Sequence, residues 1–199
     1  MLKNKAYKFR IYPNQKQMEL IEKTFGCTRF VFNYFLEKSI SMYKEEKKTL
    51  RYKDYTSMLV EIKKEYEFLK EVDSISLQQS LRHLDAAYSN FFKNKETRFP
   101  KFKSKKNDKS YTTVTVNNNI KIEDRYITLP KLGKVKIKKH RLINKEEIIK
   151  SVVVSRVSNK YYVSLVVTYE AKEISYSKMD LVLGLDYSMD KLFVSSDKE

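Results

Sequence analysis

Hydrophobic and polar positions alternate at the start of the chain. Over residues 5–12, Tyr7, Phe9 and Ile11 fall on one face, and the opposite face is basic or polar. A period of two predicts a half-buried strand. Asn14 follows this strand directly and is a residue type that caps helices.

From residue 15 the apolar positions are spaced by three and four, as in a helix. Met18, Ile21 and Phe25 share one stripe. Gly26 follows them and is the residue type expected at C′, directly after the end of a helix. We therefore expect a first helix that ends at Gly26 and a second from about residue 28 to residue 47.

Two further helices are expected before residue 95. Asp54 caps one, and Ser74 or Ser76 opens the other, whose apolar residues are spaced 4-3-4-3. That spacing is typical of a core seam. Residues 15–95 therefore predict a helical bundle.

Short alternating segments recur after Pro100 and predict strands. They are Tyr111–Val116, Ile120–Ile122, Ile127–Leu129, Lys134–Ile137, Ser151–Val157 and Tyr161–Tyr169. The last two form a hairpin turned at Ser158–Lys160. The pattern predicts an α+β fold, in which the N-terminal strand completes an all-β unit over residues 111–170 and the helices are an insertion.

The end of the chain predicts the beginning of another unit. A polar bridge, residues 171–178, leads to the apolar Leu181–Leu185, and a new strand is expected over Lys191–Ser196. A hairpin with no third strand or covering helix is not a domain. Such strands expose an apolar edge that invites pairing with another chain.

Charge narrows the class of partner. The 199 residues include 41 Lys and Arg against 25 Asp and Glu, which gives a net charge of +16. A strongly basic chain favours polyanions, because binding releases the counterions of phosphates. We expect nucleic acid rather than a membrane, because the sequence has no apolar run of membrane length, no lipidation motif and no signal peptide. The expected compartment is a prokaryotic cytoplasm, in association with the nucleoid.

Two basic segments are the candidate nucleic-acid contacts. Residues 93–109 hold eight basic side chains against two acidic ones, interleaved with Phe99 and Phe102. Residues 131–141 hold six basic side chains and no acid, with Lys134, Lys136 and Lys138 on one strand face. The alternatives are a solvated linker for the first segment and, for the second, a solvent-exposed sheet face with no binding role.

Asp186 is the candidate metal ligand. It follows four apolar residues and a glycine, which places its carboxylate at the end of a strand. The alternative is a turn or cap residue, since one carboxylate cannot hold a two-metal site. We interpret Cys27, His83 and His140 as structural or surface residues, and the lone cysteine excludes a multi-cysteine zinc site in these residues.

Several of these stretches occur in the order found in one protein family. They are Lys5–Pro13, Gly26–Asn33, Leu84–Phe92, Arg98–Lys106 with Ser110-Tyr111, Leu129–Val135 and Gly184–Asp186. Together they resemble the transposon-encoded TnpB (OrfB) proteins, relatives of the type V CRISPR effectors. The resemblance covers the N-terminal half of a full protein.

The resemblance implies a fold and an activity. The fold is a wedge-type β-barrel interrupted by a helical recognition domain and followed by a RuvC-like (RNase H-like) nuclease domain. It implies four parts: the first barrel strand at 1–13, the helical domain with its basic linker at 14–109, the rest of the barrel at 110–178, and an incomplete nuclease domain at 179–199. The implied activity is that of a transposon-associated RNA-guided DNA endonuclease, with guide RNA and double-stranded target DNA as partners.

The resemblance also implies site residues. Positions near the target motif correspond to Tyr52, Thr56, Gln78 and Asn117. Residues expected on nucleic-acid backbones are Lys5, Lys8, Arg10, Arg29, Arg98, Lys101, Lys103, Lys105, Lys106, Lys131, Lys134 and Lys136. Asp186 corresponds to the first of three catalytic carboxylates.

Two departures from the family pattern limit the activity expected of this chain. The family has glycine two residues after the catalytic aspartate, where this chain has Ser188. The other two carboxylates and the zinc knuckle lie downstream in the family. The full-length family uses Mg²⁺, but we expect this chain to bind neither Mg²⁺ stably nor zinc, and not to cleave DNA. Two alternatives remain: a naturally short, non-catalytic regulator that binds DNA or RNA, and an interaction module whose charge is incidental.

Overall fold

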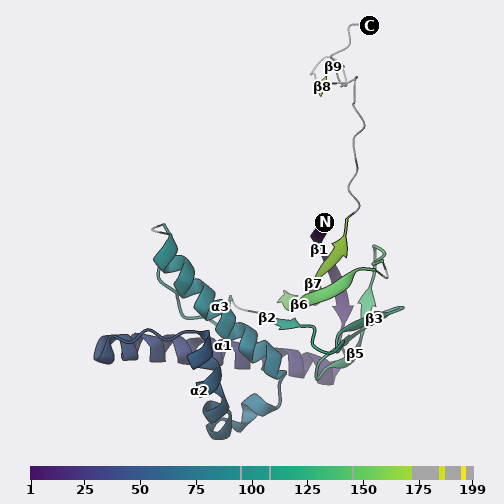
Figure 1. The fold of residues 1–199 in the computed structure, drawn as a ribbon. Helices are drawn as coiled ribbons and strands as arrows, with labels where there is room; N and C mark the ends of the chain where they lie inside the picture. The colour runs from purple at the N-terminus through teal and green to yellow at the C-terminus, as the bar shows by residue number, and fades with distance from the viewer. Residues whose placement is uncertain (95, 108, 145, 172–183, 187–193, 196–199) are drawn as a thin grey trace. The chain divides into compact units, whose positions relative to one another are not determined.

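The computed structural model of the chain describes residues 1–94, 96–107, 109–144, 146–171, 184–186 and 194–195. Residues Leu2–Glu170 form one compact unit of strands and helices (Figure 1). Its elements, in chain order, are β1 (Leu2–Tyr12), α1 (Gln15–Glu46), α2 (Tyr52–Glu65), the 3₁₀ helix η1 (Glu67–Lys70), α3 (Ser74–Lys93), β2 (Ser110–Val114), β3 (Lys121–Glu123), β4 (Tyr126–Leu129), β5 (Gly133–Lys138), β6 (Ile148–Val157) and β7 (Lys160–Glu170).

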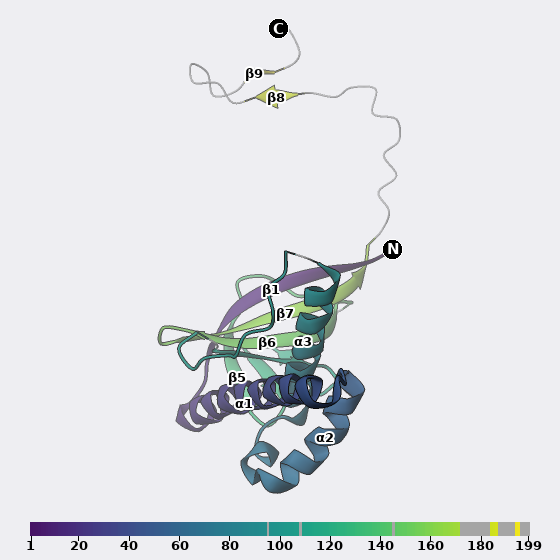
Figure 2. The ribbon, with the colours of Figure 1, turned by 90° about the vertical axis from the view of Figure 1, so that its left-hand side faces the viewer.

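The strands form one antiparallel, seven-stranded sheet in the order β2-β6-β7-β1-β5-β4-β3. Figure 2 shows that this sheet is strongly curled. Strand β1 pairs with both β7 and β5, so the first strand of the chain lies inside the sheet built by residues 110–170. The α+β class and the insertion of the helices between β1 and β2 are confirmed.

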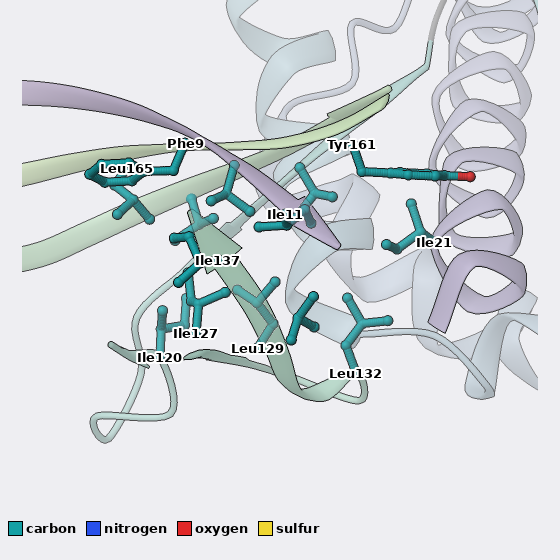
Figure 3. Packing of buried hydrophobic residues seen from close by; sticks show 14 of the residues in the cluster. Phe9, Ile11, Ile21, Ile120, Ile127, Leu129, Leu132, Ile137, Tyr161 and Leu165 are labelled. Carbon is teal, nitrogen blue, oxygen red and sulfur yellow. The ribbon is translucent and has the colours of Figure 1, made fainter. Parts of the chain in front are cut away.

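One hydrophobic core fills the inner face of the sheet. The alternation predicted for β1 is confirmed, since Tyr7, Phe9 and Ile11 are buried. Figure 3 shows Phe9 and Ile11 packing with side chains of the other strands and with Ile21 of α1. Tyr161 extends from β7 towards α1, where its hydroxyl donates to Glu22 Oε1 at 3.1 Å.

Helix α1 is a single helix, so the predicted break at Gly26 is wrong. The 32 residues from Gln15 to Glu46 are continuous. Ile21 and Phe25 pack in the sheet core, whereas Val31 and Phe35 pack in a second core among the helices. A glycine inside a helix costs only about 1 kcal/mol relative to alanine, and burial on both sides of it outweighs that cost.

The starts of α2 and α3 differ in detail from the prediction. The N-cap of α2 is Arg51, and Asp54 is its third residue, whose carboxylate accepts from the Arg51 N–H at 2.9 Å. The N-cap of α3 is Asp73, so Ser74 is already helical. At α3 the neighbours Asp73, Ser74 and Ser76 are all capping residue types, whereas the N-cap of α2, Arg51, makes no side-chain cap hydrogen bond.

Two side chains attach the helices to the sheet. Gln17 completes the capping box with Asn14, as its Oε1 accepts from the Asn14 N–H, and its Nε2 donates to the carbonyls of Leu132 and Lys134 at 3.1 and 2.9 Å. The buried Asp73 caps α3 and accepts from the hydroxyl of Thr113 on β2 at 2.6 Å. The helices are therefore held in a defined position against the strands.

Strands β8 (Leu185–Asp186) and β9 (Val194–Ser195) pair antiparallel with each other. The rest of the strand expected over Lys191–Ser196 and most of the apolar edge at Leu181–Leu185 lie outside the described residues. No helix in the described part of the chain is both long and apolar enough to cross a membrane.

Candidate nucleic-acid interface

The outward-facing side chains of the sheet form a basic and aromatic surface. Strand pairing sets Arg10 beside both Lys138 and Tyr162, and Tyr12 beside Lys136. We call this surface the outer basic face; it comprises Lys8, Arg10, Tyr12, Tyr126, Lys134, Lys136, Lys138 and Tyr162. Alternation sets this face along β1 and β5, where the residues between these positions are apolar and buried in the sheet core, and strand pairing brings the strands side by side.

Cations on the outer basic face lie over aromatic rings. The Lys8 ammonium is 5.1 Å from the ring centroid of Tyr162, and the Arg10 guanidinium is 4.8 Å from that of Tyr12. A shallow depression of about 480 Å³ lies beside them, lined mainly by Tyr12, Arg125, Lys136, Lys138 and Lys139. Such a surface offers charge to phosphates and ring faces to bases.

Of three further predicted contact residues, two lie off the outer basic face and the third, Lys134, is ion-paired on it. Lys5 lies on the opposite face of β1, 3.9 Å from Glu147 and 4.9 Å from the ring centroid of Tyr7. The hydrogen bond of Tyr7 is the main cause of the raised pKa of Lys5. Lys134 forms an ion pair with Glu123 at 3.2 Å, and Lys131 is exposed in the β4–β5 turn with a φ of 64°.

An asparagine of α1 binds the backbone of the first basic segment. We call residues 98–106 the basic strap. Asn33 Nδ2 donates to the carbonyl of Lys103 at 3.0 Å, and the Lys103 N–H donates to Asn33 Oδ1 at 2.8 Å. The Lys103 ammonium lies 4.4 Å from the ring centroid of Phe32, and the neighbouring Phe102 is 56% exposed.

The other basic residues of the strap project into solvent. Arg98, Lys101, Lys105 and Lys106 are exposed. Arg29, on α1, reaches back along its helix, with a guanidinium nitrogen 4.0 Å from where a Cβ of residue 26 would stand. The strap therefore presents four cations and two exposed rings, those of Phe99 and Phe102, from one anchored segment.

Three of the four residues matched to the family's target-motif positions lie on α2 and α3. Tyr52 and Thr56 are one turn apart on α2, and Gln78 is exposed on α3. Arg82, one turn after Gln78, has its guanidinium 4.3 Å from the ring centroid of Tyr52. These two helices therefore share one polar surface.

Asn117 lies apart from that surface in the chain. It is exposed in the β2–β3 connection, with a φ of 49°. Among the described residues, no hydrogen bond, ion pair or ring contact joins it to the target-motif residues of α2 and α3.

The described residues contain no group of three His, Cys, Asp or Glu side chains that could hold a metal ion. The backbone of Asp186 lies in β8, and its side chain is outside the description. Cys27 is buried, and its burial raises the thiol pKa to about 11.

Sequence reasoning missed the members of these surfaces that depend on strand or helix pairing. Tyr126 and Tyr162 join the outer basic face only through the register of β4 and β7. Asn33 contacts Lys103, 70 positions later in the chain, and Arg82 contacts Tyr52, 30 positions earlier. The local signals were the position of Asn33 at the end of the stretch Gly26–Asn33, which resembles the family, and the i, i+4 relation of Arg82 to Gln78.

A family model described as the helix-turn-helix domain of OrfB_IS605 proteins matches residues 1–48. In this structure those residues form β1 and the whole of the uninterrupted helix α1 rather than two helices joined by a turn. The match therefore identifies the relatives of this region, while its fold comes from the structure.

Three curated relatives match parts of the chain or nearly all of it. The putative RNA-guided DNA endonuclease InsQ of Escherichia coli (strain K12) is 32% identical over 201 residues, covering 99% of this chain and 48% of InsQ. A putative RNA-guided DNA endonuclease of Streptomyces pristinaespiralis is 39% identical over 113 residues, covering 56% of this chain and 28% of the relative. The virulence protein VsdF of Salmonella dublin is 39% identical over 111 residues, covering 51% of this chain and 93% of VsdF.

The chain spans less than half the length of the two endonuclease relatives. The alignment with InsQ nevertheless runs through nearly the whole chain, from β1 to the last residues. Together with the match at residues 1–48, this alignment shows that the chain belongs to the TnpB (OrfB) family.

Proposed function

We propose that the chain is the nucleic-acid-binding N-terminal part of a TnpB-like RNA-guided DNA endonuclease, and that it binds guide RNA and target DNA. The observation that carries this proposal is the outer basic face, where Lys8, Arg10, Lys136 and Lys138 gather among aromatic rings. The net charge of +16 and the names of the relatives support it.

The finer architecture follows the same proposal. The curled sheet corresponds to the wedge-type β-barrel, with residues 1–13 and 110–178 as its two parts and residues 14–109 as the recognition insertion. Residues 179–199 begin the RuvC-like domain. Tyr52, Thr56, Gln78 and Asn117 contact the target motif, and the basic strap follows a phosphate backbone.

The proposal separates binding from cleavage. Hydrolysis with two metal ions needs several oxygen ligands, and Asp186 supplies one carboxylate. The 199-residue chain, given magnesium and an RNA-programmed target, is expected to make no cut. A specific cut that Asp186→Ala abolishes would contradict this.

Salt-dependent binding tests the outer basic face. The affinity of the chain for duplex DNA and for single-stranded RNA is measured by fluorescence anisotropy over a range of salt concentrations. Replacing both lysines (Lys136→Ala with Lys138→Ala) makes the negative slope of log affinity against log salt less steep. The expected decrease is about 0.9 for each duplex phosphate that these two lysines neutralise.

A matched variant controls for the net charge. Lys64→Ala with Lys70→Ala removes the same charge from lysines that are ion-paired with Glu61 and Glu67 on the helices. This variant is expected to keep the wild-type slope. Equal decreases in the two double variants would mean that the outer basic face is not the site.

A further inference from the structure

An apolar pocket lies between α1, α2 and α3, away from the sheet. Its volume is about 340 Å³. Six aromatic residues line it: Tyr43, Tyr55, Tyr88, Phe91, Phe92 and Phe99. Most of these rings are spaced along the chain as core residues are. None of them belongs to the outer basic face.

The pocket has a buried floor and an exposed aromatic rim. Tyr55 is fully buried, and its hydroxyl lies 2.9 Å from Ser39 Oγ. At the rim, Phe92 is 62% exposed, Tyr43 55% and Phe99 43%. Large rings are rarely left exposed together around one hollow unless the hollow has an occupant.

The rings at the rim already lie in stacking arrangements. Phe92 lies nearly parallel to Tyr88, with an angle of 18° between the rings. Phe99 is set edge-on against both Tyr88 and Phe91, at centroid distances of 5.6 and 5.3 Å. A flat aromatic ligand entering here meets both ring faces and ring edges, the two preferred geometries.

The charge around the opening of this pocket indicates which kind of molecule would bring a flat aromatic group into it. The described residues of the flanking segments 43–51 and 92–101 include seven Lys and Arg against three Glu. Lys44 lines the pocket, and the Lys47 ammonium lies 5.5 Å from the ring centroid of Tyr43. An apolar peptide gains nothing from this rim, whereas a base attached to a phosphate backbone satisfies both the rings and the cations.

We propose that this aromatic pocket binds an unpaired nucleobase of single-stranded RNA, with the lysines at its mouth on the flanking phosphates. RNA is the source because its loops and ends present unstacked bases without the cost of opening a duplex. The inference rests on the proposed function, since it assigns one RNA contact within it.

Binding of RNA oligomers with and without their bases tests whether the aromatic pocket holds a nucleobase. Three labelled oligomers of equal length are compared by anisotropy at fixed salt: a single-stranded RNA, the same RNA with abasic residues, and the DNA of the same sequence. The chain is expected to bind the RNA about 5- to 150-fold more tightly than the abasic RNA, the range expected from stacking one base on aromatic side chains.

Substitutions at the rim assign that preference to the pocket. Phe92→Ala and Phe99→Ala bring the ratio of the two RNA affinities towards one and leave the affinity for abasic RNA unchanged. Phe99→Tyr keeps the ring and therefore the ratio. Phe68→Ala, at a ring that is 37% exposed elsewhere on the helices, is the control and keeps the wild-type ratio.

The outcomes separate this proposal from the proposed function. A wild-type ratio near one, or a ratio unchanged in both alanine variants, overturns the pocket while nucleic-acid binding stands. Tighter binding of the DNA oligomer than of the RNA overturns the assignment to RNA. Absence of salt-dependent binding to every oligomer overturns the proposed function itself.

Discussion

The link between Asn33 and the basic strap yields the sharpest prediction of the structure. The amide of Asn33 makes two hydrogen bonds to the backbone of Lys103, at 2.8 and 3.0 Å. Asn33→Ala removes both and leaves the hydrophobic contacts of α1 in place, because the neighbouring Phe32 and Phe35 provide those. The perturbation therefore acts on the strap rather than on the core.

The size of the effect follows from the two hydrogen bonds that the substitution removes. A typical intramolecular hydrogen bond contributes about 0.5–1.5 kcal/mol net, so two contribute about 1–3 kcal/mol. If the strap opens locally, the protection of the Lys103 amide against hydrogen exchange falls by about 5- to 150-fold. The affinity for nucleic acid falls as well, up to the same factor, because the ligand must then order the strap.

Hydrogen exchange followed by NMR measures this directly. Asn33→Asp is the graded variant, since it keeps an acceptor for the Lys103 N–H and loses the donor to the Lys103 carbonyl. Asn90→Ala, at an exposed position of α3, is the control and leaves the protection of Lys103 unchanged. Wild-type protection of Lys103 in Asn33→Ala would refute the role assigned to Asn33.

Three further predictions concern the scaffold. Gly26→Ala is expected to stabilise the protein by up to about 1 kcal/mol, because the added methyl meets only the flexible end of Arg29 at 4.0 Å; a lower midpoint in urea unfolding would contradict this. Asp73→Ala is expected to destabilise it by about 2–4 kcal/mol in the same assay, since it removes the cap of α3 and leaves the buried hydroxyl of Thr113 without its acceptor, and adding Thr113→Val should recover part of the loss. The Cys27 thiol, with its pKa raised to about 11 by burial, should stay unreactive towards a disulfide reagent at pH 8 until urea unfolds the chain, so fast native labelling would show that the thiol is accessible.

The parts of the fold that follow from local periodicity were predictable. The alternation of Tyr7, Phe9 and Ile11 fixed both the strand and its buried face. The seam Leu77, Leu81 and Leu84 identified α3 and its inward side in the same way. Each of these signals is carried by residues within a few positions of one another.

The surfaces were only partly predictable because they depend on pairing between distant segments. Lys134, Lys136 and Lys138 were recognisable as one basic strand face. Their neighbours on β1 and β7 became known only from the register of the sheet. The aromatic pocket combines residues from three helices and the strap, and no pattern within one segment distinguishes its rim from core.

Helix α1 shows why the error at Gly26 matters for the whole molecule. A helix that stopped at residue 26 would place Ile21 and Phe25 in one body and Val31 and Phe35 in another, joined by a flexible link. The observed helix is continuous, so its two halves enter the sheet core and the helical core as one rigid rod. The outer basic face and the basic strap, which Asn33 of α1 anchors, are therefore held in a fixed relation. The proposed function, which assigns nucleic-acid contacts to both surfaces, therefore treats them as parts of one rigid body.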